Sequence, residues 1–171
     1  ENFTGHRFDY DRLQECLENI KRMSQTFREF LKLRQNTPSP ISVFDIFTHL
    51  FPALALRGAP MHNGAWVLLQ EDAAERVAQG VSAYPDERFR LHLDGVPMWF
   101  NLSWLYSKFA SYGACPITHI YPMILTFDEL NPSNPLNSIA DCLLQSFMNR
   151  GVRQRADLIT KLVEDYHLDG L

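Results

Sequence analysis

The chain has 171 residues, of which 46% are hydrophobic and 21% are charged. That balance is typical of a protein that folds around a buried core, as one domain or as a domain with a helical annex. The net charge of −4 argues against nucleic acid as a partner, since nucleic-acid-binding domains normally carry a basic face. No apolar run approaches the roughly 20 residues that a membrane-spanning helix needs, so no membrane association is predicted.

The three cysteines, Cys16, Cys115 and Cys142, are far apart in the sequence. No CxxC pair or Cys/His cluster accompanies them, so we predict no metal site within this chain. An odd number of thiols without a signal peptide indicates reduced cysteines and a cytoplasmic setting. We interpret all three as buried thiols without a chemical role.

The first half of the chain is predicted to be helical. Apolar residues at helical spacing predict an amphipathic helix from about residue 9 to residue 35, ended by Pro38 and Pro40. A second helix begins at Ser42, with Asp45 completing an approximate capping box, and is apolar on most sides, so we expect it to be deeply buried. A third helix is expected from about Met61 to Gln79, ending at Gly80.

Residues 88–127 predict a strand, a helix and a second strand. The first strand alternates up to Asp94-Gly95, the helix begins at about Asn101 and ends at Gly113, and the second strand ends at Tyr121-Pro122. Such βαβ units pair their strands in parallel. Two further helices are expected over about residues 135–148 and 152–166. The final residues, 168–171, are interpreted as the approach to another strand, and we expect the chain to be part of a longer polypeptide.

Ligands of open parallel sheets bind at the carboxyl ends of the strands. In this chain those ends carry Gly95 and Trp99, followed by Asn101 at a helix start, and Tyr121. His119 could act as an acid or a base, although a lone histidine is more often structural. His92 is expected to pack or to face solvent. No GxGxxG or GxxxxGK[ST] motif is present, and no catalytic residue can be assigned.

Several stretches along the whole chain carry a family resemblance. They are Pro40-Ile41-Ser42, Gly95-Val96-Pro97-Met98-Trp99, Gly113, Tyr121 and the closing Leu168-Asp169-Gly170-Leu171. In this order they resemble the subunits of the 2-hydroxyacyl-CoA dehydratase and benzoyl-CoA reductase family. The resemblance implies an α/β fold with a helical segment (1–86) that packs on an incomplete α/β domain (87–171). The second part would hold a parallel, flavodoxin-like or Rossmann-like βαβ sheet flanked by helices.

Family membership would imply an anaerobic iron–sulfur enzyme. Its members bind a [4Fe-4S] cluster beside an acyl-CoA, pair with a sister subunit and receive an electron from an ATP-dependent iron–sulfur activator protein. The cysteines of this chain do not match the cluster ligands, which the resemblance therefore implies lie outside it. What carries over is part of the acyl-CoA pocket, with Gly95, Trp99, Asn101 and Tyr121 as candidates, and the segment alone would be inactive.

Two other functions remain open at this stage. The chain could be a non-catalytic α/β interaction or assembly module that uses the long first helix and the apolar second helix as an interface. A response-regulator-like domain is a weaker alternative, since its acidic cluster and phosphoacceptor aspartate are not evident. The acyl group, and the choice between dehydration and ring reduction, do not follow from the sequence.

Overall fold

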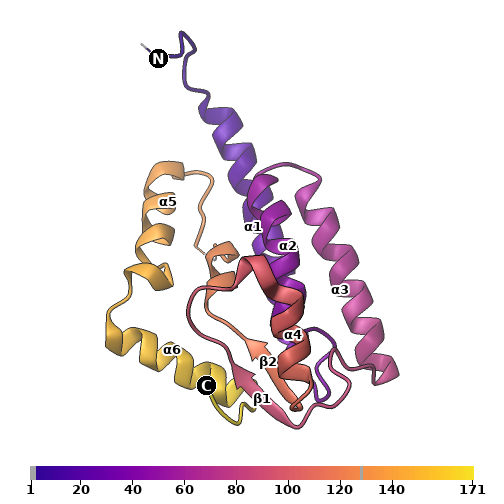
Figure 1. The fold of residues 1–171 in the computed structure, drawn as a ribbon. Coiled ribbons are helices and arrows are strands. Elements are labelled where there is room, and N and C mark those ends of the chain that lie inside the picture. The colour runs from indigo at the N-terminus through magenta and orange to yellow at the C-terminus, as the bar shows by residue number, and fades with distance from the viewer. Residues whose placement is uncertain (1–2, 128) are drawn as a thin grey trace.

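A computed structural model describes residues 3–127 and 129–171 and confirms the α/β fold class (Figure 1). In chain order the elements are α1 (Tyr10–Lys32), α2 (Val43–Ala55), α3 (His62–Gln79), β1 (Phe89–His92), α4 (Leu102–Ala110), β2 (Ala114–Thr118), α5 (Pro135–Leu144) and α6 (Val152–Asp165). Single turns of 3-10 helix separate some of them: η1 (Leu33–Gln35), η2 (Trp99–Asn101), η3 (Tyr121–Leu125) and η4 (Phe147–Asn149). None of the described helices is both long and apolar enough to cross a membrane.

The two strands of the predicted βαβ unit pair in parallel, with Phe89 opposite Ala114. The other side of β1 receives the end of the chain. There Leu91 forms a parallel bridge with Gly170, whose carbonyl accepts the His92 N–H at 2.9 Å. The prediction that the final residues approach another strand is therefore confirmed.

The helix boundaries follow the local sequence signals. Ser42 and Asp45 form the expected capping box, with the Ser42 N–H donating to Asp45 Oδ2 at 2.7 Å. Gly80 and Gly113 end their helices with φ of 66° in each case, a backbone conformation that disfavours residues with a Cβ. The first helix reaches Gln35 as expected, but its last turn is the 3-10 helix η1.

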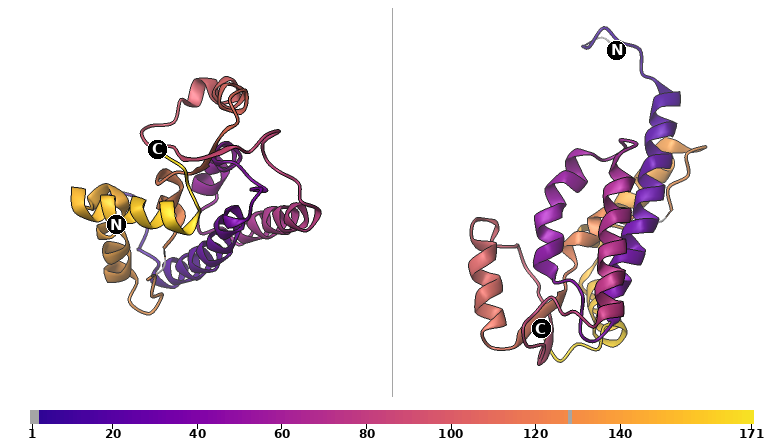
Figure 2. Two further views of the ribbon diagram at one scale, coloured as in Figure 1. Left: turned by 90° about the horizontal axis from the view of Figure 1, so that it is seen from below. Right: turned by 90° about the vertical axis from the view of Figure 1, so that its right-hand side faces the viewer.

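Helices cover the strands from both sides. Figure 2 shows α4 on one side of the strands, and α1, α3 and α6 on the other. The main core lies among α1, α2 and α3, around Trp66 and Phe27, and reaches Leu125 of η3. A second cluster joins β2 to α6 through Ile117 and Leu162. This packing leaves the carboxyl ends of both strands between α2 and the η2–α4 segment.

Some details of the expected elements were wrong. Both strands are shorter than expected, because β1 ends at His92 and β2 at Thr118, so that Tyr121 lies in η3 instead of ending a strand. The second helix is less deeply buried than expected, because fewer than half of its residues are buried and Phe51 is 79% exposed. Cys115 is buried as expected, whereas Cys16 and Cys142 are only half-buried.

Candidate functional site

Two histidines lie side by side where the parallel strands end. His92 is the last residue of β1 and His119 follows the last residue of β2, and both are buried. Their rings stack with centroids 6.3 Å apart. His92 Nδ1 lies 2.8 Å from the Thr118 hydroxyl, which ties the two strand ends together. The parallel register is what brings these side chains from distant parts of the sequence to one edge.

Each histidine has a buried nitrogen without a partner. The Tyr121 N–H donates to His119 Nδ1 at 2.8 Å, so the proton of the neutral His119 ring is on Nε2. Among the residues that the structure describes, this Nε2, like that of His92, is buried and has no hydrogen-bond partner. Burial, together with His92, lowers the pKa of His119 to about 4, although Asp94 and the Gly95 backbone oppose the shift. Burial also lowers the pKa of His92. At neutral pH, His119 is therefore an uncharged donor.

Aromatic rings line the same edge of the sheet. Phe47 of α2 packs against His119 at a centroid distance of 5.1 Å and against Trp99 at 5.5 Å. Tyr121 in turn lies 5.9 Å from Trp99 and 6.2 Å from His119. Trp99 remains 44% exposed. We call Phe47, Trp99, His119 and Tyr121 the strand-end cluster; it combines the buried imidazole N–H of His119 with aromatic ring faces.

The structure brings two of the four predicted site residues, Trp99 and Tyr121, into the strand-end cluster. Gly95 is close enough for its backbone to affect the pKa of His119. Its φ of 94° requires glycine for the backbone, although a Cβ there would meet no atom within 4 Å. Asn101 is exposed and makes no side-chain cap on α4. A binding role for these four residues stays a prediction.

Phe47 and the pairing of the two histidines were not predicted from the sequence. His119 was expected at the end of the second strand, whereas His92 was expected within the first strand, because that strand was predicted to continue to Asp94-Gly95. Their pairing depends on the register of the two strands, which the sequence pattern alone does not define. Phe47 could not be placed, because nothing in the apolar second helix indicates which of its residues meets the strands.

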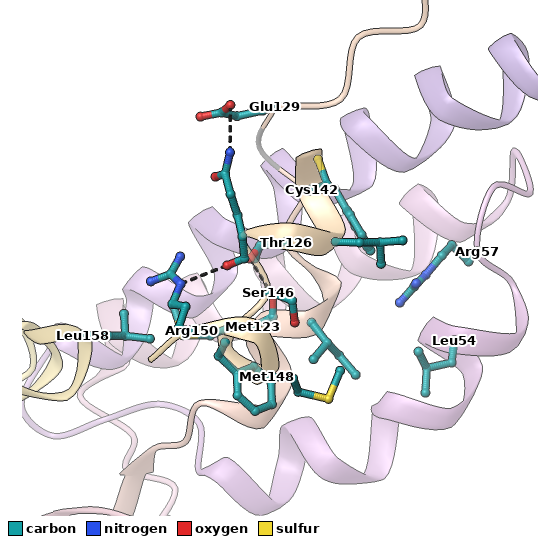
Figure 3. Close-up of a pocket in the computed structure, with 15 residues that line it drawn as sticks. Leu54, Arg57, Met123, Thr126, Glu129, Cys142, Ser146, Met148, Arg150 and Leu158 are labelled. Carbon is teal, nitrogen blue, oxygen red and sulfur yellow. Dashed lines mark hydrogen bonds between the residues drawn. The ribbon is translucent and has the colours of Figure 1, made fainter. Parts of the chain in front are cut away.

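A cavity of about 280 Å³ opens next to the cluster (Figure 3). Met123 of η3 and Phe147 of η4 line it, and the Phe147 ring lies 6.2 Å from the ring of Tyr121. None of the four predicted site residues is among the residues that line this cavity.

The cysteines of this chain do not fit a [4Fe-4S] cluster. Across residues 3–127 and 129–171, no three His, Cys, Asp or Glu side chains come together to hold a metal ion. Cluster ligands are thiolates, but burial raises the pKa of Cys115 to about 11 and also raises that of Cys142. These thiols are protonated at neutral pH and lie in different elements.

The buried His119 predicts a pH-dependent stability. Its folded-state pKa of about 4 lies below the usual histidine value of 6.5, so protonation favours the unfolded chain. The stabilisation is complete above pH 6.5 and is lost as the pH falls toward 4. Between pH 7 and pH 5, the chain should lose about 2 kcal/mol more than the His119→Asn variant, in which Asn can still accept the Tyr121 N–H. Urea unfolding at the two pH values measures this difference; equal losses would contradict the assignment.

A parallel βαβ unit with helices before and after it defines an α/β protein. The sequence model of 2-hydroxyglutaryl-CoA dehydratase, D-component, matches residues 1–171. The chain belongs to this family, which confirms the resemblance found from the sequence.

Two known relatives are similar to this chain over its whole length, and a third over part of it. A benzoyl-CoA reductase subunit from Thauera aromatica is 28% identical over all of it, and (R)-2-hydroxyglutaryl-CoA dehydratase subunit alpha from Acidaminococcus fermentans is 25% identical. The chain covers 42% and 35% of these two proteins. The (R)-phenyllactyl-CoA dehydratase alpha subunit of Clostridium sporogenes is 26% identical over 71% of the chain and 30% of its own length.

Proposed function

We propose that this chain is part of a subunit of an iron–sulfur-dependent acyl-CoA dehydratase or benzoyl-CoA reductase, and that its strand-end cluster forms part of the acyl-CoA pocket. The observation that carries the proposal is the family match over residues 1–171. The relatives are named both as dehydratase and as reductase subunits, so the choice between the two reactions stays open within the proposal.

The geometry of the strand-end cluster suits a thioester. The exposed face of Trp99 and the ring of Tyr121 offer apolar contact to an acyl chain or an aromatic ring. The neutral His119 lies beside them with a buried N–H that has no partner. This N–H would donate a hydrogen bond to the thioester carbonyl and would stabilise negative charge that develops on its oxygen. Gly95 and Asn101 would complete the rim.

The iron–sulfur group and the protein partners belong to the proposal only as expectations. A [4Fe-4S] group would supply electrons from cysteines outside this chain, since the thiols here do not fit it. The relatives are named as subunits, which supports a sister subunit; an ATP-dependent activator protein follows from the family resemblance.

The three free cysteines support a reducing compartment such as the cytoplasm. Residues 1–86 would form a helical segment and residues 87–171 the α/β part.

Calorimetric titration of the chain with benzoyl-CoA tests the proposed pocket. We expect saturable binding that Trp99→Ala weakens by about tenfold, the equivalent of one lost aromatic contact. Trp104→Ala is the matched control, since Trp104 is 54% exposed on the neighbouring helix α4; it should change the affinity by less than about twofold. Absence of binding, or equal effects of the two variants, would count against an acyl-CoA pocket at the strand ends.

A non-catalytic assembly module is the second candidate, and exposed apolar groups favour it. Val96 and Phe100 lie in the same loop region as Trp99 and are 80% and 86% exposed. This exposed surface is not the interface expected from the sequence, which lay on the first two helices. In the structure, α1 and α2 bury most of their apolar residues within the chain. Under this candidate, the chain should bind a sister subunit but no CoA thioester, so the same titration separates the two.

A further inference from the structure

The three segments that surround the strand ends contain no lysine and no arginine. They are α2 with its caps (42–56), the end of β1 with the first part of α4 (91–107), and β2 with η3 (114–125). Apart from histidines, their acidic and basic residues are Asp45 and Asp94 alone. The Asp45 carboxylate accepts the Ser42 N–H in the capping box of α2. Asp94, directly after β1, is therefore the charge of interest at this edge of the sheet.

Asp94 lies beside the two histidines at the strand ends. The Leu93 N–H donates to the Thr118 carbonyl at 2.9 Å, so the residues that follow these two, Asp94 and His119, are neighbours across the parallel pair. Burial lowers the pKa of His92 and His119, and the Asp94 carboxylate opposes this shift in both, as a carboxylate within Coulomb range of both rings must. Asp94 is exposed, and no ion pair of its side chain is found among the described residues.

The cation whose charge reaches the histidines is buried and already has partners. Arg34 adds to the lowering of both histidine pKa values by burial. It is 3% exposed, and its guanidinium donates to the carbonyls of Leu31 and Ile117. Arg150, which follows η4, lines the neighbouring cavity and donates to the Gln145 carbonyl at 2.9 Å. The accessible charge at the strand-end cluster is therefore negative.

The accessible side chains around Asp94 are apolar or aromatic. Trp99 is partly exposed and Tyr121 is half-buried, and Val96 and Met98 are exposed on the same loop as Asp94. None of the cation–π contacts of the described residues involves the strand-end cluster. An uncharged acyl group would find apolar contacts here. A carboxylate would lose hydration without gaining a cation, and Asp94 would repel it.

We infer that the strand-end pocket takes thioesters of uncharged acyl groups, and that Asp94 is a specificity-determining residue that disfavours acyl groups with a free carboxylate. The inference rests on the proposed acyl-CoA pocket and deepens it by naming the class of acyl group. Selectivity of this kind comes from an unfavourable contact with the wrong ligand and not from an additional contact with the right one. Because Asp94 is exposed to water, the discrimination should be moderate and should weaken as salt is added.

Calorimetric titration with glutaryl-CoA and with its terminal amide tests the inference, because the two thioesters share their size and their CoA part and differ in one charge. We expect the amide to bind at least about fivefold more tightly, and Asp94→Asn to bring the two affinities within about twofold of each other. Asp157→Asn removes the same charge from an exposed position of α6, which lies on the other side of the strands from α4 (Figure 2). This control should leave the affinity ratio unchanged. Equal binding of the two thioesters, or a ratio that Asp94→Asn does not reduce, would overturn the inference.

A salt series on the unmodified chain tests the same repulsion without a substitution. Raising the ionic strength from about 0.02 M to about 0.5 M shortens the range of electrostatic interactions to about the size of a side chain. The ratio of the two affinities should then fall by about twofold or more, whatever salt does to the binding of the shared CoA part. A ratio that does not depend on salt would contradict an electrostatic origin and overturn the role of Asp94.

Benzoyl-CoA in the same titrations separates a failure of this inference from a failure of the proposed pocket. If benzoyl-CoA binds and Trp99→Ala weakens it, while glutaryl-CoA and its amide bind equally, the pocket stands and the role of Asp94 is overturned. If none of the three thioesters binds, the proposed acyl-CoA pocket is overturned and the inference falls with it.

Discussion

Replacing Arg90 with methionine should lower the free energy of unfolding by about 3–5 kcal/mol, the usual effect of breaking a buried ion pair. Arg90 lies in β1, and only 7% of its side chain is exposed. It pairs with the buried Glu87 and donates to the carbonyls of Tyr166 at 3.0 Å and Arg34 at 2.7 Å. One side chain thereby joins the sheet, the end of α1 and the end of α6. Urea unfolding followed by circular dichroism measures the change.

Two further variants separate the effect of losing the ion pair from the effect of changing the side-chain volume. Methionine at position 90 leaves the Glu87 carboxylate buried without its cation, although the Ser39 N–H still donates to it at 2.7 Å. Adding Glu87→Gln to the Arg90→Met variant should therefore restore about 1–2 kcal/mol of the free energy of unfolding, because burying an uncharged amide costs less than burying a carboxylate. Arg88→Met, at an exposed position beside it, should cost less than about 1 kcal/mol. Similar losses at positions 88 and 90 would show that the network contributes little.

The βαβ unit was predictable because its signals are local. An alternating run, a helical period closed by Gly113 and a β-branched run follow one another in residues 88–127. Together with the rule that such strands pair in parallel, they give the pairing that the structure confirms. The caps at Ser42 and Gly80 belong to the same kind of short-range pattern.

The buried arginines were not predictable in this way. Charged residues of an alternating strand or an amphipathic helix are normally assigned to the solvent side. Arg34 and Arg90 are nevertheless 3% and 6% exposed. Besides one near neighbour each, Glu87 for Arg90 and Leu31 for Arg34, their partners are backbone carbonyls from distant segments. Arg34 Nη1, for example, donates to the Ile117 carbonyl at 2.6 Å. No short-range pattern records such a contact, because the acceptor can belong to any residue type.

Because short-range sequence patterns do not record contacts between distant segments, they also missed parts of the candidate site. Trp99 and Tyr121 follow directly from the strand-end rule, and the structure places both in one cluster. The pairing of His92 with His119 needs the register of the two strands, which is a property of the folded chain and not of the sequence pattern.

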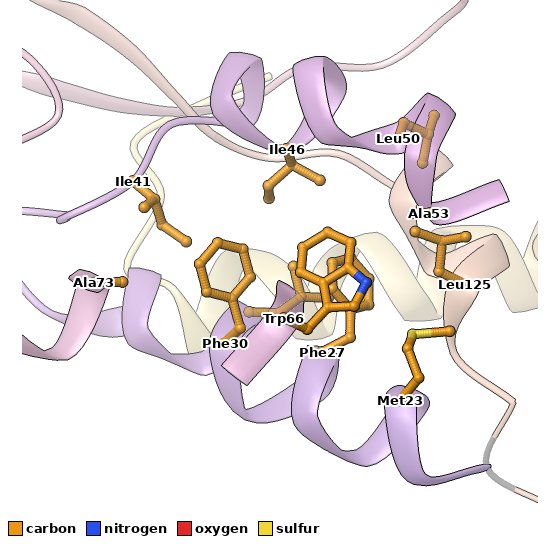
Figure 4. Packing of buried hydrophobic residues seen from close by; sticks show 11 residues of the cluster. Met23, Phe27, Phe30, Ile41, Ile46, Leu50, Ala53, Trp66, Ala73 and Leu125 are labelled. Carbon is orange, nitrogen blue, oxygen red and sulfur yellow. The ribbon is translucent and has the colours of Figure 1, made fainter. Parts of the chain in front are cut away.

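Replacing Trp66 with alanine should cost about 3–5 kcal/mol, the range for truncating a large aromatic core residue. Trp66 of α3 is 2% exposed and fills the space between α3 and α1, with its ring centroid 4.5 Å from that of Phe27 and 5.6 Å from that of Phe30 (Figure 4). The cavity left by the missing ring would lie between α1 and α3, which are not joined to each other by strand pairing. Urea unfolding measures the loss.

Trp66→Phe separates packing from the indole hydrogen bond. The indole N–H donates to His62 Nε2 at 3.2 Å, and phenylalanine leaves that buried nitrogen unpaired, so we expect a loss of about 1–3 kcal/mol. Trp104→Ala removes the same ring from an exposed position and should cost less than about 1 kcal/mol. A Trp66→Ala variant no less stable than Trp104→Ala would mean that the α1–α3 contact is not part of the cooperative core. The helical segment would then have to be stabilised by its contacts with η3 and β2 alone.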